Sequence, residues 1–420
     1  MKALLSLAWH SAWSRRFVLS LVVVSIALST LLLLGIEQLR RDARDSFSQA
    51  VSGTDLIVGA RTGPVSLLLY SVFRVGGATN NIRWASVEAI RANPAVDWVV
   101  PISLGDSHRG FAVVGTTTDY FKHFHYGDRQ ALAMAQGRPF EGVFEAVLGA
   151  EVARRLGYRL GDRIVLSHGD GARAANDHTD KPFAIVGVLA PTGTPVDRSV
   201  HISLAAMEAI HLDWMAGAPL PGLTVTPEQA LQQDLTPRQV TAALVGLKRR
   251  SSVFSVQRWV ANYQAEPLLA VLPGVALDEL WDLVGLGERS LMAVSALVAI
   301  VSVLGLVAVV LAGLNERRRE LAILRAVGAG PRHVLMLLLL EGALVTGLGL
   351  LAGIAACVGV TLSLAPWAQS HVGLTLSLAW PGEAEVRIVG LILVTGLGAS
   401  LLPAWRAYRL ALADGLSPRA

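Results

Sequence analysis

The chain has 420 residues, of which 53% are hydrophobic and only 16% are charged, and its mean hydropathy is positive. A soluble protein of this size needs more polar surface, so the composition excludes an ordinary soluble class and favours a membrane protein. The net charge of +4 is concentrated in short loops between apolar segments and therefore does not indicate nucleic-acid binding.

Four apolar runs are long enough to cross about 30 Å of hydrocarbon as helices, which takes about 20 residues. They occupy residues 17–36, 290–314, 334–364 and 386–405. The first could also be a cleaved signal peptide, but it is longer than the usual apolar core and GIEQLRRD follows it, where a small-residue cleavage site would stand. We therefore expect an α-helical membrane protein with four transmembrane helices, preceded by an amphipathic cytoplasmic segment at residues 1–16.

The short loops predict the orientation in the membrane. Residues 315–333 hold several arginines, whereas residues 365–385 hold no Lys or Arg. Because basic residues concentrate on the cytoplasmic side, we expect both termini, including the tail at residues 406–420, to be cytoplasmic. The only cysteine, Cys357, lies in the third run, so the outer domain has no disulfides. This pattern fits a multi-pass protein of a bacterial inner membrane facing the periplasm.

Residues 37–289 form a predicted α+β periplasmic domain, inserted between the first and second spans. Short β-branched runs predict strands, and helical patterns fall between them; the strands are expected at 55–59, 98–104, 110–115, 163–167 and 183–189, and the helices at 84–93, 150–157 and 203–211. The second span continues back to residue 276 without a proline, which predicts a helix that extends beyond the membrane as a stalk. Gly285 and Gly287 mark a possible break in it.

Two histidine-rich stretches of this domain are candidates for metal binding. KHFHYGD contains His123 and His125, and HGDGARAANDHTD contains His168 and His178 beside several aspartates. A metal site needs three or four ligands that converge in space, and no third ligand lies close to His123 in the sequence. We therefore expect solvated surface loops and no bound metal, with these four histidines as the candidate ligands of the alternative.

Motifs for catalysis are missing from the sequence. There is no GxxxxGK[ST] loop to hold phosphates, no GxSxG elbow and no HExxH helix. We expect a non-catalytic chain that does not hydrolyse ATP by itself.

The third span carries one ionisable residue and a pair of spaced glycines. Glu341 is either a functional group within the membrane or a side chain that reaches the inner surface or pairs with an arginine of the preceding loop. Gly349 and Gly353 form a GxxxG pattern, which allows two helices to approach closely. With so few polar residues in the spans, packing is favoured over a solute pathway.

The segment NERRRELAILRAVGAG, residues 315–330, joins the second and third spans and combines charged with apolar residues. This pattern predicts an amphipathic helix near the membrane surface, ended by glycines before Pro331. Binding to anionic lipid explains the arginines but not the glutamates that flank them. A partner protein explains both.

Residues 316–329, ERRRELAILRAVGA, resemble the connector of the MacB/LolC/FtsX-like permeases, the membrane subunits of type VII ABC transporters. The closing PAWRAYRLALADGL is similar to the C-terminal motif of that family, except that Ala413 or Asp414 replaces the usual proline. The stretches DLIVGARTGP and LGAEVARRLGYRLGDRI are similar to its periplasmic core domain.

The resemblance implies a dimer of permeases, identical or different, with two copies of a cytoplasmic ABC ATPase that binds ATP and magnesium, while this chain binds no cofactor. A periplasmic adaptor or lipoprotein is a further partner in this class. The connector would be the coupling helix that docks on the ATPase, through Glu316, Arg317, Arg319, Glu320, Leu321, Leu324, Arg325 and Gly328. Motion passed to the periplasmic domain would drive export or extraction of a substrate. The alternatives are an FtsX-like regulator or scaffold of periplasmic enzymes, and a component that handles metal or a metal-binding partner.

Overall fold

The computed structural model describes residues 16–50, 52–127, 129–169, 177–215, 218–219, 225–316, 330–371, 376, 378 and 382–413. The chain divides into two compact units. We call Met1–Asp42, Val284–Trp367 and Leu376–Ala420 the helical unit, and Ala43–Leu283 with Ala368–Thr375 the inserted unit. Each unit is described by itself.

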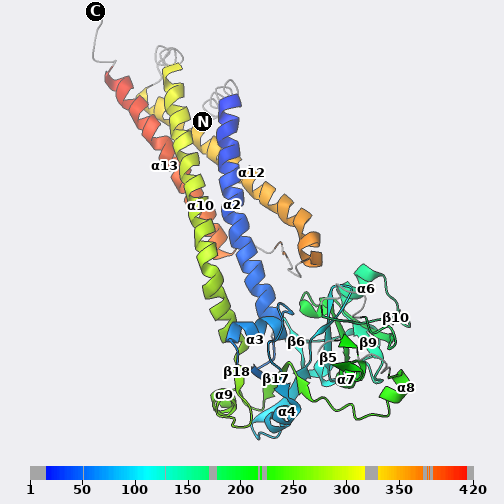
Figure 1. The fold of residues 1–420 in the computed structure, drawn as a ribbon. Helices are drawn as coiled ribbons and strands as arrows, with labels where there is room; N and C mark the ends of the chain where they lie inside the picture. Colours follow the sequence, from blue (N-terminus) through cyan, green and yellow to red (C-terminus); the bar gives the residue numbers. More distant parts are fainter. Residues whose placement is uncertain are drawn as a thin grey trace, which may run out of the picture. The chain divides into compact units, whose positions relative to one another are not determined.

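Four helices in the described part of the chain are long and apolar enough to cross a membrane, by length and composition. They are α2 (Arg16–Gln49), α10 (Pro273–Glu316), α12 (Pro331–His371) and α13 (Glu383–Ala413), labelled in Figure 1. Within the helical unit, Leu19, Val22 and Ile26 of α2 form a buried cluster with Val345 of α12 and Ala399 of α13. The fold is therefore that of a four-span helical membrane protein, as the sequence predicted.

Helix α10 does not break where two of its glycines could have interrupted it. It continues through Gly285 and Gly287 as one helix of 44 residues, about 66 Å long at 1.5 Å per residue. Each glycine costs about 1 kcal/mol of helix stability relative to alanine. That cost is too small to end a helix with long apolar turns on its C-terminal side, so the possible break does not occur.

The inserted unit contains a four-stranded sheet in the order β18-β1-β17-β3, in which all neighbours are antiparallel. Its strands are β1 (Leu56–Ala60), β3 (Val96–Ile102), β17 (Ala242–Leu247) and β18 (Leu268–Val271). Strand β1 is buried at every position, as a central strand covered on both faces should be. Helices α3 (Pro64–Ser71), α4 (Trp84–Arg91) and α9 (Val253–Ala261) contact this sheet.

A second, mixed sheet of eight strands has the order β10-β12-β9-β13-β5-β4-β11, with β8 paired to β12. Its strands are β4 (Asp106–His108), β5 (Phe111–Thr116), β8 (Met134–Gly137), β9 (Glu145–Leu148), β10 (Arg163–Ile164), β11 (Ser167–His168), β12 (Phe183–Leu189) and β13 (Ser199–Ser203). Burial alternates along β12, which occupies the predicted residues 183–189. The strand expected at 163–167 is instead two short strands, β10 and β11, which pair with different partners.

Two helices pack on the eight-stranded sheet, α6 (Ala150–Leu156) and α7 (Leu204–His211). The Ser203 hydroxyl accepts a hydrogen bond from the Ala206 amide and so begins α7 directly after β13. Smaller elements complete the inserted unit: β2 (Ile82–Arg83), α5 (Asp119–His123), β6 (His125–Tyr126), β7 (Gln130–Ala131), η2 (Pro195–Arg198), β14 (Trp214–Met215), β15 (Ala218–Pro219), α8 (Pro227–Ala230), β16 (Gln239–Val240) and η3 (Arg250–Ser252). The inserted unit is thus the α+β domain that the sequence predicted between the first and second spans.

Candidate functional site

The predicted coupling segment lies almost wholly outside the described residues. Helix α10 ends at Glu316 and α12 begins at Pro331. The other coupling candidates fall between these elements and are not described: Arg317, Arg319, Glu320, Leu321, Leu324, Arg325 and Gly328. The assignment of these residues to ATPase docking stays a prediction from the sequence.

Glu341 is buried within the helical unit. Only 5% of its surface is exposed. It is an ionisable residue within an apolar stretch of α12. The neighbouring Gly342 faces Ser400 of α13 so closely that an added Cβ atom would overlap the serine side chain. Glu341 therefore lies inside the helix packing rather than on the surface of the unit.

Gly349 and Gly353 lie where α12 approaches α2. A Cβ atom added to Gly349 would be 2.7 Å from the Cβ of Ile26, and one added to Gly353 would be 2.5 Å from the Cβ of Thr30. Both separations are too short for real side chains. The two glycines therefore let the backbones of α12 and α2 approach more closely than any larger residue would allow.

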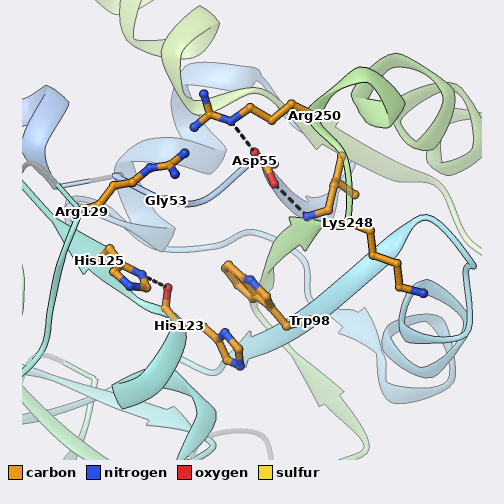
Figure 2. Close-up of a pocket in the computed structure, with 9 residues that line it drawn as sticks. Gly53, Asp55, Trp98, His123, His125, Arg129, Lys248 and Arg250 are labelled. Atoms are coloured by element: carbon orange, nitrogen blue, oxygen red, sulfur yellow. Dashed lines mark hydrogen bonds and ion pairs between the residues drawn. The ribbon is translucent and has the colours of Figure 1, made fainter.

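His123 and His125 border a cavity of about 570 Å³ in the inserted unit (Figure 2). The His123 ring stacks on Trp98 at a centroid distance of 5.0 Å, and the Nδ1 atom of His125 faces the backbone oxygen of His123 at 2.7 Å. Three basic residues, Arg129, Lys248 and Arg250, line the cavity together with one carboxylate, Asp55, whose Oδ1 atom lies 3.6 Å from Nε of Arg250. This chemistry would suit an anionic group, and the two histidines do not converge on a common metal position.

Two further histidines have structural roles. His108 contacts the Val165 carbonyl oxygen at 2.7 Å and the Tyr158 hydroxyl at 3.0 Å through its two ring nitrogens. His201 is fully buried beside Tyr120, and burial lowers the pKa of its imidazole to about 3. Both rings are accounted for by packing and hydrogen bonds.

His168 and His178 converge with two residues that the sequence did not single out as ligands, Asp106 and His211. Asp106 in β4 and His168 in β11 are directly opposite each other in an antiparallel pair. His211 is the last residue of α7, and His178 follows Asp177, which bridges to Ser167. One ligand atom from each of the four residues can be chosen so that all lie within 4.8 Å of one another.

The electrostatics of this cluster centre on the buried carboxylate. Burial disfavours ionisation of Asp106, but hydrogen bonds from His168 and His211 outweigh burial and lower its pKa to about 2. Burial also lowers the pKa of His178 to about 4, so its ring is neutral at neutral pH. Burial acts the same way on His211, but there the hydrogen bond to Asp106 prevails and raises the pKa. The cluster therefore combines an anionic oxygen with imidazole nitrogens.

Sequence reasoning missed Asp106 and His211 because nothing local connects them to the HGDGARAANDHTD stretch. His168 lies 62 positions beyond Asp106 and 43 positions before His211. The one available signal was their position, since Asp106 stands at the start of a short strand and His211 at the end of a predicted helix. A carboxylate and a histidine at the ends of elements can be recognised as neighbours of His168 only when the strand pairing is known.

The fold defines a class of protein, a multi-pass membrane protein with a large α+β domain between its first and second spanning helices. Residues 18–262 match the family of MacB-like periplasmic core domains, and residues 292–412 match the FtsX-like permease C-terminal family. The first match alone covers more than half of the 420 residues. The chain belongs to this MacB- and FtsX-like permease family, and it is a permease subunit of the ABC transporter class.

Three curated proteins illustrate the relationship. The lipoprotein-releasing system transmembrane protein LolC of Neisseria meningitidis serogroup B is 22% identical over 313 residues, which is 70% of each chain. The macrolide export ATP-binding/permease protein MacB of Azoarcus sp. is 26% identical over 54% of this chain and 32% of its own length. MacB of Syntrophobacter fumaroxidans is 32% identical over 29% of this chain and 16% of its own. The chain thus spans a third or less of these MacB proteins.

Two solved structures resemble parts of the chain. The periplasmic region of MacB from Actinobacillus actinomycetemcomitans has 10% sequence identity and a TM-score of 0.34, and the match covers 56% of this chain and 96% of that one. The extracellular domain of the transporter YknZ from Gram-positive bacteria has 11% identity and a TM-score of 0.30, over 52% and 98%.

Proposed function

We propose that this chain couples ATP hydrolysis by a separate ABC ATPase to motion of its inserted unit, and that this motion drives export or extraction of a substrate at the periplasmic face. The observation that carries the proposal is the continuity of α10. This helix begins at Pro273, separated by one residue from the end of β18 at Val271, and it continues without interruption to Glu316, the first residue of the connector motif. A continuous helix can pass a displacement from one end to the other.

The connector would dock on the ATPase through its charged and apolar residues. Glu316, Arg317 and Glu320 supply charges of both signs within five positions, which suits a protein surface better than an anionic membrane alone. ATP and magnesium would belong to the ATPase, present in two copies, and a second permease chain would complete the transporter. A periplasmic adaptor or lipoprotein would receive or deliver the substrate.

We further propose that both termini are cytoplasmic, because the loop after α10 is rich in arginine and residues 365–385 contain no Lys or Arg. A single cysteine in a Cys357→Ser background tests this orientation. Arg332→Cys should react with an impermeant maleimide only after the cells are opened, whereas Gly382→Cys should react in intact cells. The reverse pattern would refute the orientation.

The coupling proposal is tested by replacing Glu316, Arg317 and Glu320 together with alanine. The triple variant should insert into the membrane but lose both co-purification of an ABC ATPase and stimulation of its ATP hydrolysis. A matched triple variant at exposed charged residues of the inserted unit, Glu88, Arg91 and Glu141, should retain both. Unchanged coupling in the connector variant would exclude this segment as the docking site.

A further inference from the structure

Four donor atoms meet at the edge of the eight-stranded sheet, where β4 and β11 lie beside the C-terminal end of α7. The Nδ1 atom of His168 lies 3.0 Å from Oδ1 of Asp106 and 3.1 Å from Nε2 of His211. The same Asp106 oxygen lies 3.4 Å from Nε2 of His211 and 4.0 Å from Nε2 of His178. Ligands of a tetrahedral Zn²⁺, each about 2.0–2.2 Å from the metal, lie about 3.3–3.6 Å apart. The donors are thus close to the spacing that a single cation needs.

Hydrogen bonding within the cluster accounts for only three of its members. Asp106, His168 and His211 contact one another, but both ring nitrogens of His178 are buried without a hydrogen-bond partner among the described residues. The same holds for Oδ2 of Asp106. Buried polar atoms are almost always paired, so atoms left over in this way need an explanation. A cation bound between the four side chains would give one ring nitrogen of His178 and the Asp106 carboxylate a common partner.

Neighbouring contacts orient the ring of His211 as a metal-binding histidine requires and hold the backbone that carries His178. The Nδ1 atom of His211 faces the Met207 carbonyl oxygen at 2.7 Å, which leaves Nε2 directed at the cluster. The amide of His178 donates to the Leu166 carbonyl oxygen at 2.8 Å, and the amide of Lys181 donates to the His178 carbonyl oxygen at 3.1 Å. The buried Lys181 ammonium in turn contacts both carboxylate oxygens of Asp213 at 2.9 Å. The segment that carries His178 is therefore fixed on both sides.

Among the described residues, the cluster is covered on one side and partly exposed through two of its rings. The Trp214 ring contacts His178 and His168 at centroid distances of 4.4 and 5.4 Å and covers the cluster with an apolar face. The side chains of Asp106 and His178 are fully buried, whereas those of His168 and His211 are 32% and 27% exposed. A cation could enter past these two rings and be held by the buried pair behind them.

We propose that Asp106, His168, His178 and His211 form a binding site for a late first-row divalent cation, of which Zn²⁺ is the best match. Three imidazoles and one carboxylate are typical ligands of Zn²⁺, whereas Mg²⁺ and Ca²⁺ prefer sites made of oxygen atoms. Because the ligands come from two strands, one helix and the turn after Asp177, a bound cation links these segments. This site departs from the expectation of no metal and is independent of ATPase coupling.

The test uses the full chain in detergent, carrying no polyhistidine tag, stripped with a chelator and then dialysed against Zn²⁺. We expect about one Zn²⁺ per chain by elemental analysis. Competition with a chromophoric chelator should show that His178→Ala and His211→Ala each weaken binding by more than about 100-fold, since even loss of a ligand's supporting partner costs 10- to 100-fold. The His123→Ala/His125→Ala double variant is the matched control and should bind as the unmodified chain does.

Two results would overturn the site. One is a stripped chain that takes up no more Zn²⁺ than the His178→Ala variant does, and the other is an equal loss of binding in the His123→Ala/His125→Ala control. If the ligand variants fail to fold, Co²⁺ added to the unmodified chain decides. Intense visible absorption from tetrahedral Co²⁺, abolished by one equivalent of Zn²⁺, supports the site, and a spectrum of octahedral aqueous Co²⁺ refutes it.

Discussion

Two regions of the molecule hold distant chain segments together in opposite ways. In the helical unit, α12 meets α2 at Gly349 and Gly353, where contact depends on side chains being absent. In the inserted unit, β4, β11 and α7 meet at Asp106, His168 and His211, where contact depends on polar side chains being present. Substitutions that add atoms should therefore disrupt the contact in the first region, and substitutions that remove atoms should disrupt the contact in the second.

The difference follows from the surroundings. Between apolar helices there are few polar groups to join, so close backbone approach supplies the dispersion contacts. At the edge of the eight-stranded sheet, short strands bury little apolar area, and charged hydrogen bonds or the proposed metal supply further stabilisation. Substitutions in each region can test this contrast.

The largest effect is expected at Lys181, which holds the segment carrying His178. Its fully buried ammonium lies 2.7 Å from Asp180 and 2.9 Å from Asp213. Lys181→Met would leave buried carboxylate unpaired and should lower the free energy of unfolding of the inserted unit by about 3–5 kcal/mol. Lys122→Met is the control, since Lys122 is 69% exposed in its pair with Asp119 and should cost less than about 1 kcal/mol. Denaturant titration followed by tryptophan fluorescence measures both, and equal costs would contradict the structure.

Zinc should protect the cluster locally. When free Zn²⁺ is present at 100 times its dissociation constant, binding stabilises the folded state by about 2.7 kcal/mol. Amides whose exchange requires an opening that releases the ion should then exchange about 100-fold more slowly. Hydrogen exchange should therefore slow in β4, β11 and the end of α7. Exchange in α5 and β6, which carry His123 and His125, should not change. Uniform slowing across the inserted unit would argue against a local site.

Adding one carbon atom should disrupt the helix contact. The alanine Cβ in Gly353→Ala would lie 2.5 Å from the Cβ of Thr30 and 2.7 Å from the Ala27 carbonyl oxygen, so α2 must move away, at about 1–3 kcal/mol. Gly347→Ala is the control in the same helix, since nothing lies within 4 Å of its added Cβ. Thermal unfolding of the full chain in detergent should separate the two variants. A Gly353→Ala variant as stable as Gly347→Ala would show that the two helices are not so close.

The smallest effect is expected at the histidine pair outside the cluster. His123→Ala removes the ring that stacks on Trp98 at an interplanar angle of 19° and should cost about 0.5–1.5 kcal/mol of stability. His125→Ala removes no ring stacked on Trp98 and serves as the comparison. Denaturant unfolding followed by tryptophan fluorescence measures the stability of both variants. A loss of zinc affinity in either variant would break the distinction between the two histidine groups.

The helical unit could be predicted from sequence because its signals are local. An apolar run of about 20 residues is sufficient to identify a spanning helix, and the GxxxG spacing of Gly349 and Gly353 falls on one face of one helix. Continuity of α10 was harder to predict, because Gly285 and Gly287 weaken a helix locally while the flanking turns decide whether it continues.

The metal cluster depends on pairing between strands that are too short to be recognised. Strand β4 has three residues and β11 has two. Neither is long enough to show the alternation of apolar and polar residues by which a strand is recognised in a sequence. The strand predicted at 163–167 merged β10 with part of β11 and so hid the residue opposite Asp106. Only the register, with His168 facing Asp106, identifies the pair.

The two strands that adjoin α2 and α10 have a mechanical consequence. Strand β1 follows α2, and β18 precedes α10; they are antiparallel neighbours, with Ile57 opposite Val271. Both helices therefore attach at the same end of one strand pair. Pulling the joined ends of the two strands apart sideways would peel the ladder open one hydrogen bond at a time, whereas sliding one strand along the other would load all its bonds in shear, because these bonds run across the strands. The joint is compliant in one direction and stiff in the other.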